Sequence, residues 1–202
     1  MKNKGCVIAI IIVAILAILA VSIYAYVKGK YNSFVQQKLD VENNWAEIDN
    51  QYKRRADLIP NLVNTVKGYA AHEKETFTEV IEARAKATSV NIDAENLTPE
   101  MMQQFQQAQA GLTQALSKLM VVVEQYPDLK ANTNFIRLQD ELAGTENRIA
   151  VVRMRYNEIV TIYNKNISIF PNNILAGIFN FDKEPLYKID ESEKETPQVK
   201  FD

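Results

Sequence analysis

The chain opens with an apolar run, Val7 to Val27, that contains no charged residue, proline or glycine. A helix rises about 1.5 Å per residue, so the run spans roughly 30 Å, the thickness of one hydrocarbon core. Tyr24 and Tyr26 near its end suit a membrane interface. The basic start at Lys2 and Lys4 also fits a cleaved signal peptide, but signal cores are typically about 7 to 15 residues long. The run therefore predicts a retained transmembrane helix rather than a signal peptide or a buried core helix.

Beyond this run, large apolar residues recur at every seventh position, a spacing that predicts helices packed as in a coiled coil. The spacing is clearest toward the C-terminal end, where the two interleaved sets are Phe135, Leu142, Ile149, Tyr156, Tyr163 and Phe170, and Leu138, Thr145, Val152, Ile159 and Asn166. A similar seam covers residues 31–69, where Lys38 and Arg55 interrupt it. Another covers residues 105–126.

These seams predict three long helices separated by two short interruptions. Residues 89–97 are polar and loop-like, and residues 124–132 form a tight corner. Capping residues and prolines mark the helix ends, because proline is tolerated only in a first turn and small polar side chains cap free N–H groups. These markers are Thr98 with Pro99, Pro127, Asn132 or Thr133, and Pro171.

The predicted fold is all-α, with an N-terminal transmembrane helix followed by an elongated antiparallel bundle of three long, coiled-coil-like helices. We divide the chain into a tip and anchor at residues 1–28, a bundle domain at 29–181 and a mostly disordered tail at 182–202. We expect the first bundle helix to continue from the membrane span, where Gly29 is the one residue able to interrupt it. The tail is rich in Glu, Lys and Pro. The less favoured alternative is that its apolar residues dock, namely Leu186, Tyr187, Ile189, Val199 and Phe201.

The formal net charge is −2, and basic residues are scattered among acidic ones, so the basic stripe that binds nucleic acid is missing. Cys6 is the sole cysteine, which excludes an intrachain disulfide and a cysteine metal cluster. We interpret it as an ordinary small residue, with reversible acylation as the alternative. Lysines flank the apolar run on both sides, so the positive-inside comparison is nearly a tie.

The segment from Arg54 to Asn61 combines adjacent arginines with a proline inside a predicted helix. Proline lacks the N–H that would bond to the Ala56 carbonyl, which costs about 3 kcal/mol in an ordinary helix. In the favoured interpretation, Pro60 bends the helix and Arg55 pairs with an acid of the seam such as Glu146. In the alternative, the segment is a partner-binding surface made of Arg54, Arg55, Asp57, Pro60 and Asn61.

The remaining polar residues form no catalytic or cofactor-binding pattern. His72 is the only histidine, so neither a two-histidine zinc site nor a matched triad is present. The glycines are isolated, unlike those of a phosphate-binding loop. The bundle carboxylates lack the Glu-x-x-His pattern of di-metal bundles; they are Glu124, Asp128, Glu141 and Glu146. We predict no catalytic residue, cofactor or metal.

Polar residues also follow the third seam, at Tyr156-Asn157, Tyr163-Asn164 and Asn166. Buried amides commonly fix the register of a bundle, and this interpretation is favoured. A tyrosine-lined groove for a partner helix is the alternative.

Several motifs occur in order along the chain: Tyr31-Asn32, Arg54-Arg55-Ala56-Asp57-Leu58-Ile59-Pro60-Asn61-Leu62-Val63, His72-Glu73, Ala83-Arg84-Ala85, Glu124-Gln125-Tyr126-Pro127-Asp128-Leu129-Lys130-Ala131, Leu142 with Thr145-Glu146-Asn147-Arg148-Ile149-Ala150, Tyr156-Asn157, Phe170-Pro171 and Pro197-Gln198-Val199-Lys200-Phe201. With the N-terminal anchor, they make the chain similar to the LemA family of bacterial membrane proteins over essentially its whole length. The resemblance implies a helical bundle in the cell membrane, a short outer N terminus and a large cytoplasmic domain. It implies no particular reaction.

We therefore expect a membrane-anchored helical scaffold or adaptor rather than an enzyme. It contacts the lipid bilayer through Val7 to Val27 and binds another membrane or envelope protein, and a homo-oligomer is compatible with this function. One alternative is a hydrolase or metal-dependent enzyme that uses the bundle carboxylates. Another is a lipid-organising element, for which Lys28 and Lys30 give weak support.

Overall fold

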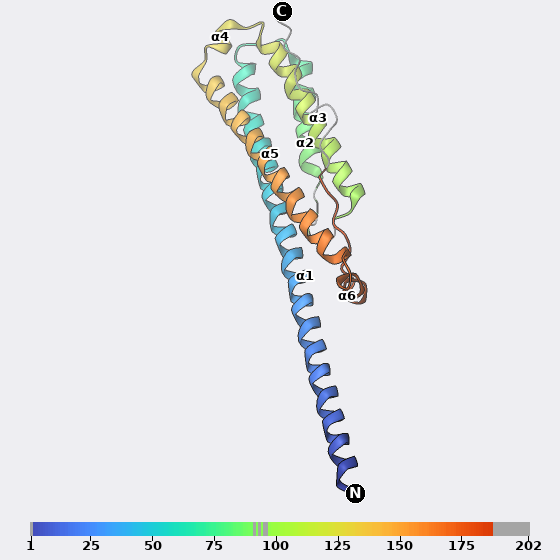
Figure 1. The fold of residues 1–202 in the computed structure, drawn as a ribbon. Helices are drawn as coiled ribbons and strands as arrows, with labels where there is room; N and C mark the ends of the chain where they lie inside the picture. The colour runs from blue at the N-terminus through green and yellow to red at the C-terminus, as the bar shows by residue number, and fades with distance from the viewer. Residues whose placement is uncertain (1, 91, 93, 95–96, 188–202) are drawn as a thin grey trace, which may run out of the picture. The chain divides into compact units, whose positions relative to one another are not determined.

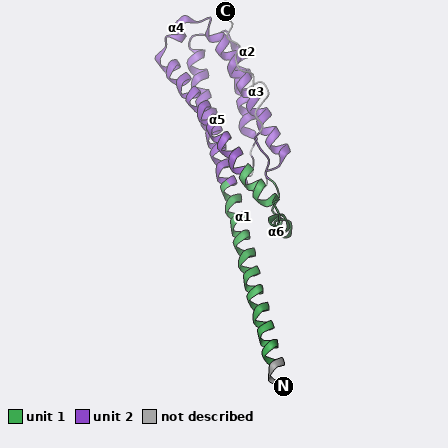
Figure 2. Cartoon of the chain, viewed as in Figure 1, with its two compact units in different colours: residues 1–40, 161–183 green, residues 41–160, 184–202 purple. Residues whose placement is uncertain are grey.

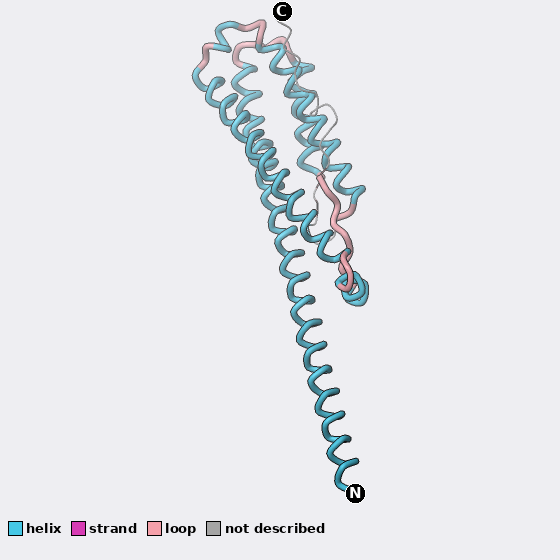
Figure 3. The backbone as a smooth tube through the Cα atoms, in the orientation of Figure 1, coloured by secondary structure: helices cyan, strands magenta, loops and turns pink. Residues whose placement is uncertain are grey.

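A computed structural model describes residues 2–90, 92, 94 and 97–187 of the chain. Its helices are α1 (Lys2–Lys67), α2 (Lys74–Ser89), α3 (Pro99–Val123), α4 (Pro127–Lys130), α5 (Thr133–Ser168) and α6 (Asn172–Phe179) (Figure 1). Turns and loops join these helices, and the described residues include no strand (Figure 3). The predicted all-α class is confirmed.

The chain divides into two compact units, and α1 and α5 contribute to both (Figure 2). Unit 1 contains residues 1–40 and 161–183, and unit 2 contains residues 41–160 and 184–202. Unit 1 therefore holds the apolar N-terminal half of α1 together with α6, whereas unit 2 holds α2, α3 and α4.

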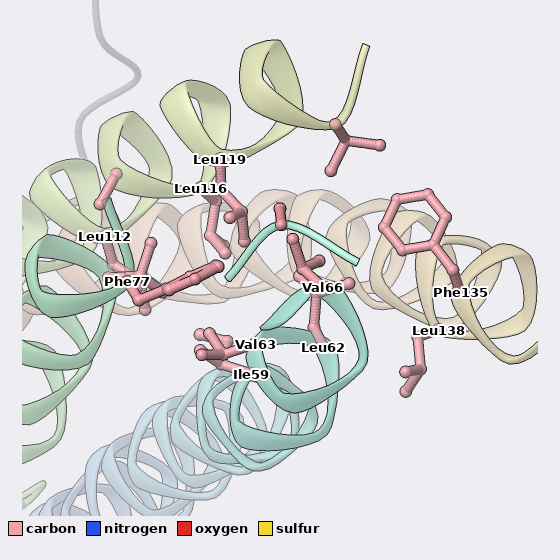
Figure 4. Close-up of a cluster of buried hydrophobic side chains, with 14 of the residues drawn as sticks. Ile59, Leu62, Val63, Val66, Phe77, Leu112, Leu116, Leu119, Phe135 and Leu138 are labelled. Atoms are coloured by element: carbon pink, nitrogen blue, oxygen red, sulfur yellow. The ribbon is translucent and has the colours of Figure 1, made fainter. Parts of the chain in front are cut away.

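Unit 2 is a helical bundle built by the C-terminal part of α1, by α2 and α3, and by the first part of α5. Figure 4 shows their apolar side chains meeting in one core, with Ile59 and Leu62 from α1, Phe77 from α2 and Leu119 from α3. The α5 residue Phe135 belongs to the same core. All five side chains are at most 3% exposed, so the apolar seams predicted from the sequence do form the interior of this unit.

The prediction of three long helices is wrong in one respect, because the first predicted stretch is two helices. Helix α1 ends at Lys67, and the chain turns through residues 68–73 before α2 begins at Lys74. Gly68 has a low helix propensity, and the Val66 carbonyl instead accepts the N–H groups of Tyr69 and Ala70 in a tight turn. Tyr69, predicted as a seam residue, is 43% exposed.

The other predicted helix ends are close to those observed. The Thr98 hydroxyl accepts the N–H of Met101 at the start of α3, and the Asn132 side chain accepts the N–H of Phe135 at the start of α5. Pro127 begins the short helix α4 inside the predicted corner. Asn132 also donates to the Tyr69 hydroxyl, so this corner contacts the turn between α1 and α2.

The seven-residue spacing places most of the buried face of α5 correctly. Tyr156 and Tyr163 are fully buried, as predicted. In the second set of seam positions, near the C-terminal end of α5, the buried residues are Val160 and Ile167 instead of the predicted Ile159 and Asn166. A straight helix has about 3.6 residues per turn and drifts by about 20° per seven residues, which explains this shift. Phe170 was predicted in the seam but is 79% exposed, because α5 ends at Ser168.

In unit 1, the described part of the apolar run lies on α1 and is exposed along its length, with the side chains from Val7 to Tyr26 facing outward. Among the described residues, α1 is the one helix long and apolar enough to cross a membrane. A core helix of a soluble domain would bury these side chains, so that interpretation is excluded. Gly29 lies inside the helix without ending it.

Two adjacent substitutions on α3 should change stability in opposite directions. Leu112 is 1% exposed, so Leu112→Ala should lower the free energy of unfolding by about 2–5 kcal/mol. A Cβ added at Gly111 meets nothing within 4 Å, so Gly111→Ala should raise the free energy of unfolding by up to about 1 kcal/mol. Urea unfolding of the detergent-solubilised protein, followed by circular dichroism, measures both. A destabilising Gly111→Ala would contradict the described packing of α3.

Candidate functional site

The five residues of the predicted partner-binding surface divide into a buried and an exposed group. Arg55 is 5% exposed, whereas Arg54, Asp57, Pro60 and Asn61 are exposed on α1. Successive residues of a helix are turned by about 100°, so adjacent arginines face different surroundings. The candidate surface therefore consists of four residues, and we call these four the α1 face.

Arg55 joins three helices of unit 2 from the inside. One guanidinium nitrogen lies 3.3 Å from a carboxylate oxygen of Glu146 on α5, and the other donates to the Thr113 hydroxyl on α3 at 2.8 Å. A buried charge is tolerated only when it is paired and hydrogen bonded. The ion pair between Arg55 and Glu146 that the structural interpretation expected is present.

Pro60 leaves the Ala56 carbonyl without its main-chain donor, and Arg84 on α2 replaces that donor. The Arg84 Nε donates to the Ala56 carbonyl oxygen at 2.7 Å, and an Arg84 terminal nitrogen lies 3.9 Å from an Asp57 carboxylate oxygen. Ala56 is 3% exposed, so water has little access to satisfy this carbonyl. The proline therefore stays inside a continuous helix because a neighbouring helix completes the hydrogen bond.

The role of Arg84 was not predicted from the sequence. In the sequence, its motif Ala83-Arg84-Ala85 contributes only to the family resemblance. Recognising that Arg84 faces Ala56 requires the turn after Lys67, which folds α2 back along α1, and the seam pattern did not reveal this turn.

The bundle carboxylates considered for catalysis are not gathered at one place. Glu124 pairs with Lys130 at 2.6 Å within the corner, and Glu146 pairs with Arg55. His72 is exposed in the turn between α1 and α2. Over residues 2–90, 92, 94 and 97–187, no group of three or more His, Cys, Asp or Glu side chains has metal-binding geometry.

The Tyr156-Asn157 pair holds a C-terminal segment of the chain in unit 2. The Tyr156 hydroxyl donates to the Pro185 carbonyl at 2.9 Å. The Asn157 amide donates to the Tyr187 carbonyl and accepts the Tyr187 N–H, both at 2.8 Å. The Arg153 guanidinium lies 4.3 Å from the centre of the Tyr187 ring. The polar groups of Tyr156 and Asn157, predicted as part of a partner-binding groove in the alternative interpretation, therefore bind the chain's own residues 185 and 187.

Docking, the less favoured alternative for the tail, is thus observed for Tyr187, which is 5% exposed. The prediction of disorder for the rest of the tail, and the docking alternatives at Ile189, Val199 and Phe201, concern residues 188–202, which lie outside the described part of the chain.

Burial changes the acidity of two tyrosines in this region. The Tyr52 and Tyr187 hydroxyls share a hydrogen bond of 2.7 Å, and burial raises the pKa of Tyr52 even though this bond and Arg153 oppose the shift. Burial raises the pKa of Tyr156 as well, and the nearby Glu184 carboxylate adds to the shift. Both hydroxyls therefore remain protonated at neutral pH.

The compensation of Pro60 by Arg84 can be tested with a double-mutant cycle. Arg84→Met should cost about 1–3 kcal/mol of unfolding free energy, because the Ala56 carbonyl loses its donor. In a Pro60→Ala background, position 60 regains an N–H for this carbonyl, so the same change should cost at least about 1 kcal/mol less. Urea unfolding of the four proteins gives the coupling. Equal costs in the two backgrounds would show that Arg84 does not compensate for the proline.

The raised tyrosine pKa values predict a loss of stability at alkaline pH. An unfolded tyrosine has a pKa of about 10, so the folded state binds these protons more tightly. The stabilisation is complete below that value and is lost as pH rises toward the folded pKa. Unfolding free energies measured from about pH 8 to about pH 11 should fall, and Tyr156→Phe should flatten the fall. A slope unchanged by this substitution would contradict the assignment to Tyr156.

The chain is similar to known proteins over most of its length. The model of the LemA family matches residues 44–201. Magnetosome protein MamQ 2 from Paramagnetospirillum magneticum is 26% identical over 203 residues, covering 92% of this chain and 74% of that protein. Protein LemA from Metamycoplasma hominis is 26% identical over 179 residues, covering 88% of this chain and 78% of that protein. Magnetosome protein MamQ from Magnetospirillum gryphiswaldense is 26% identical over 188 residues, covering 83% of this chain and 69% of that protein. With its apolar N-terminal helix, the chain is membrane-associated and belongs to the LemA family.

Proposed function

We propose that the protein is a membrane-anchored helical adaptor. Val7 to Val27 cross the bilayer, and the α1 face, formed by Arg54, Asp57, Pro60 and Asn61, binds another membrane or envelope protein. The observation that carries this proposal is the exposure of these four side chains beside buried neighbours that hold the helix in place. Family analogy favours the cytoplasmic side for the bundle.

The α1 face has properties suited to recognition. Arg54, Asp57 and Asn61 are three and four residues apart, so they project from one side of the helix and present a positive, a negative and an amide group. Pro60 adds a rigid apolar ring among them. Arg55 and Arg84 fasten this part of α1 to its neighbours, so a partner would meet a preorganised surface and less ordering entropy would be lost on binding.

A matched pair of substitutions tests the α1 face. Arg54→Ala should weaken the association with a partner by at least about tenfold, or about 1.4 kcal/mol, without lowering the unfolding temperature. Arg137→Ala is the control, since Arg137 is an exposed arginine of the same unit on α5. Arg55→Ala is unsuitable as a binding test because Arg55 lies inside the bundle.

The measurement is photo-crosslinking in native membranes from probes placed beside the α1 face, with captured species identified by mass spectrometry. We expect the probes to capture one protein. Arg54→Ala should diminish this capture, and Arg137→Ala should leave it unchanged. Equal capture in both variants, or no captured partner, would count against an adaptor function for this face. Capture of the same chain would show that the face joins copies of the protein. Protease accessibility in intact and opened cells tests the proposed cytoplasmic side.

A further inference from the structure

Helix α6 in unit 1 is fastened to α1 at the end of the apolar run. The Tyr26 hydroxyl donates to the side-chain oxygen of Asn172, the first residue of α6, at 3.3 Å. The Asn172 amide in turn donates to the carbonyl and the side-chain oxygen of Asn166 on α5, at 3.0 and 2.8 Å. Asn166 donates to Gln37 on α1 at 2.9 Å. Asn172 is 2% exposed, so this amide network fixes the start of α6 beside Tyr26.

Aromatic contacts fasten the other end of α6. The Phe179 ring packs edge-on against Tyr31 with centroids 5.0 Å apart, and Phe181 packs against Tyr31 and Phe34 at 5.7 and 5.4 Å. Tyr31 and Phe34 follow the apolar run by one or two helical turns. The start of α6 is therefore held against the end of the predicted membrane span, and its other end against the next two turns of α1.

The face of α6 that points away from these contacts is strongly apolar. Ile174 is 52% exposed and Ile178, four residues further on, is 64% exposed; Phe170, in the turn just before α6, is 79% exposed. Ile169 is exposed beside them. No Lys, Arg, Asp or Glu occurs from Asn166 to Phe181. Such a contiguous apolar patch is uncommon on a surface that meets only water and marks a binding surface for protein or membrane.

The position of α6 identifies the bilayer as its occupant. The patch lies close to the end of the apolar run, because Tyr26, the penultimate residue of that run, donates a hydrogen bond to Asn172, the first residue of α6. An eight-residue helix is only about 12 Å long, too short to cross a membrane but suited to the boundary between headgroups and acyl chains. Lys28 and Lys30 lie on the intervening turn of α1, where they add attraction for anionic headgroups.

We propose that α6 is an interfacial helix, and that its residues Ile174 and Ile178, together with Phe170 of the preceding turn, insert into the surface of the same bilayer that α1 crosses. The chain then has two membrane contacts, one across the bilayer and one along its surface. This inference rests on the proposed membrane anchor, and it is independent of the α1 face and of any protein partner.

The test uses the full chain in vesicles of phosphatidylcholine and phosphatidylglycerol. Cys6, the sole cysteine, is replaced in a Cys6→Ser background, and a fluorescent probe is attached after Ile174→Cys, Ile15→Cys or Gln36→Cys. Ile15 lies within the apolar run, and Gln36 is an exposed residue of α1 about 14 Å beyond Val27. Quenching is measured with lipids that carry a nitroxide near the headgroup or deep in the acyl chain, and with aqueous iodide.

We expect the probe at position 174 to be quenched at least about twofold more by the shallow nitroxide than by the deep one, and to be shielded from iodide compared with position 36. Position 15 should be quenched most by the deep nitroxide. Lipid quenching at 15 but not at 174 would overturn this inference and leave the anchor intact. Absence of lipid quenching at both would overturn the anchor itself, and the proposed function with it. Shielding of 174 from iodide without lipid quenching would show that protein covers the patch, which also overturns the inference.

Discussion

A polar group taken out of water needs a hydrogen-bonding partner, and in this chain distant segments supply those partners. Pro60 leaves the Ala56 carbonyl without a main-chain hydrogen-bond donor, and Arg84 from the next helix donates to it instead. The Tyr156 hydroxyl and the Asn157 amide donate to the carbonyls of Pro185 and Tyr187 near the C-terminal end of the described chain. These bonds, rather than the apolar seams alone, determine which helix faces lie together, because apolar packing tolerates alternative registers that polar pairing does not.

Arg54 and Arg55 illustrate how one sequence segment serves two purposes. The seam of unit 2 passes through Tyr52, Arg55 and Ile59, so the interior position of Arg55 follows from helical spacing. Arg54, turned about 100° away, is free of that constraint. A motif conspicuous for its adjacent charges thus contains a structural residue beside candidates for recognition, and burial separates them more clearly than residue type does.

Local patterns predicted much of the fold. Helix class, the caps at Thr98 and Asn132 and most core positions depend on neighbours within one or two turns, and the sequence displays these directly. The sequence did not predict the turn after Lys67, because a single glycine such as Gly68, with no proline after it, is a weak signal for the end of a helix. The role of Arg84 escaped because it depends on that turn. For the candidate surface, spacing identified the segment and anticipated the pairing of Arg55, but exposure of its other residues required the packed bundle.

The hold on the C-terminal segment has a consequence for how its sequence is constrained. The Asn157 side chain accepts the Tyr187 N–H and donates to the Tyr187 carbonyl, as the main chain of a neighbouring strand would. The Tyr156 hydroxyl donates to the carbonyl of residue 185. The Tyr187 side chain contacts Tyr52 and Arg153, and the Glu184 carboxylate lies near Tyr156. Leu186 is exposed between these points. The hold on this segment therefore depends on the path of its backbone and on one aromatic hydroxyl, so the exposed position 186 can vary in sequence while the segment keeps its place.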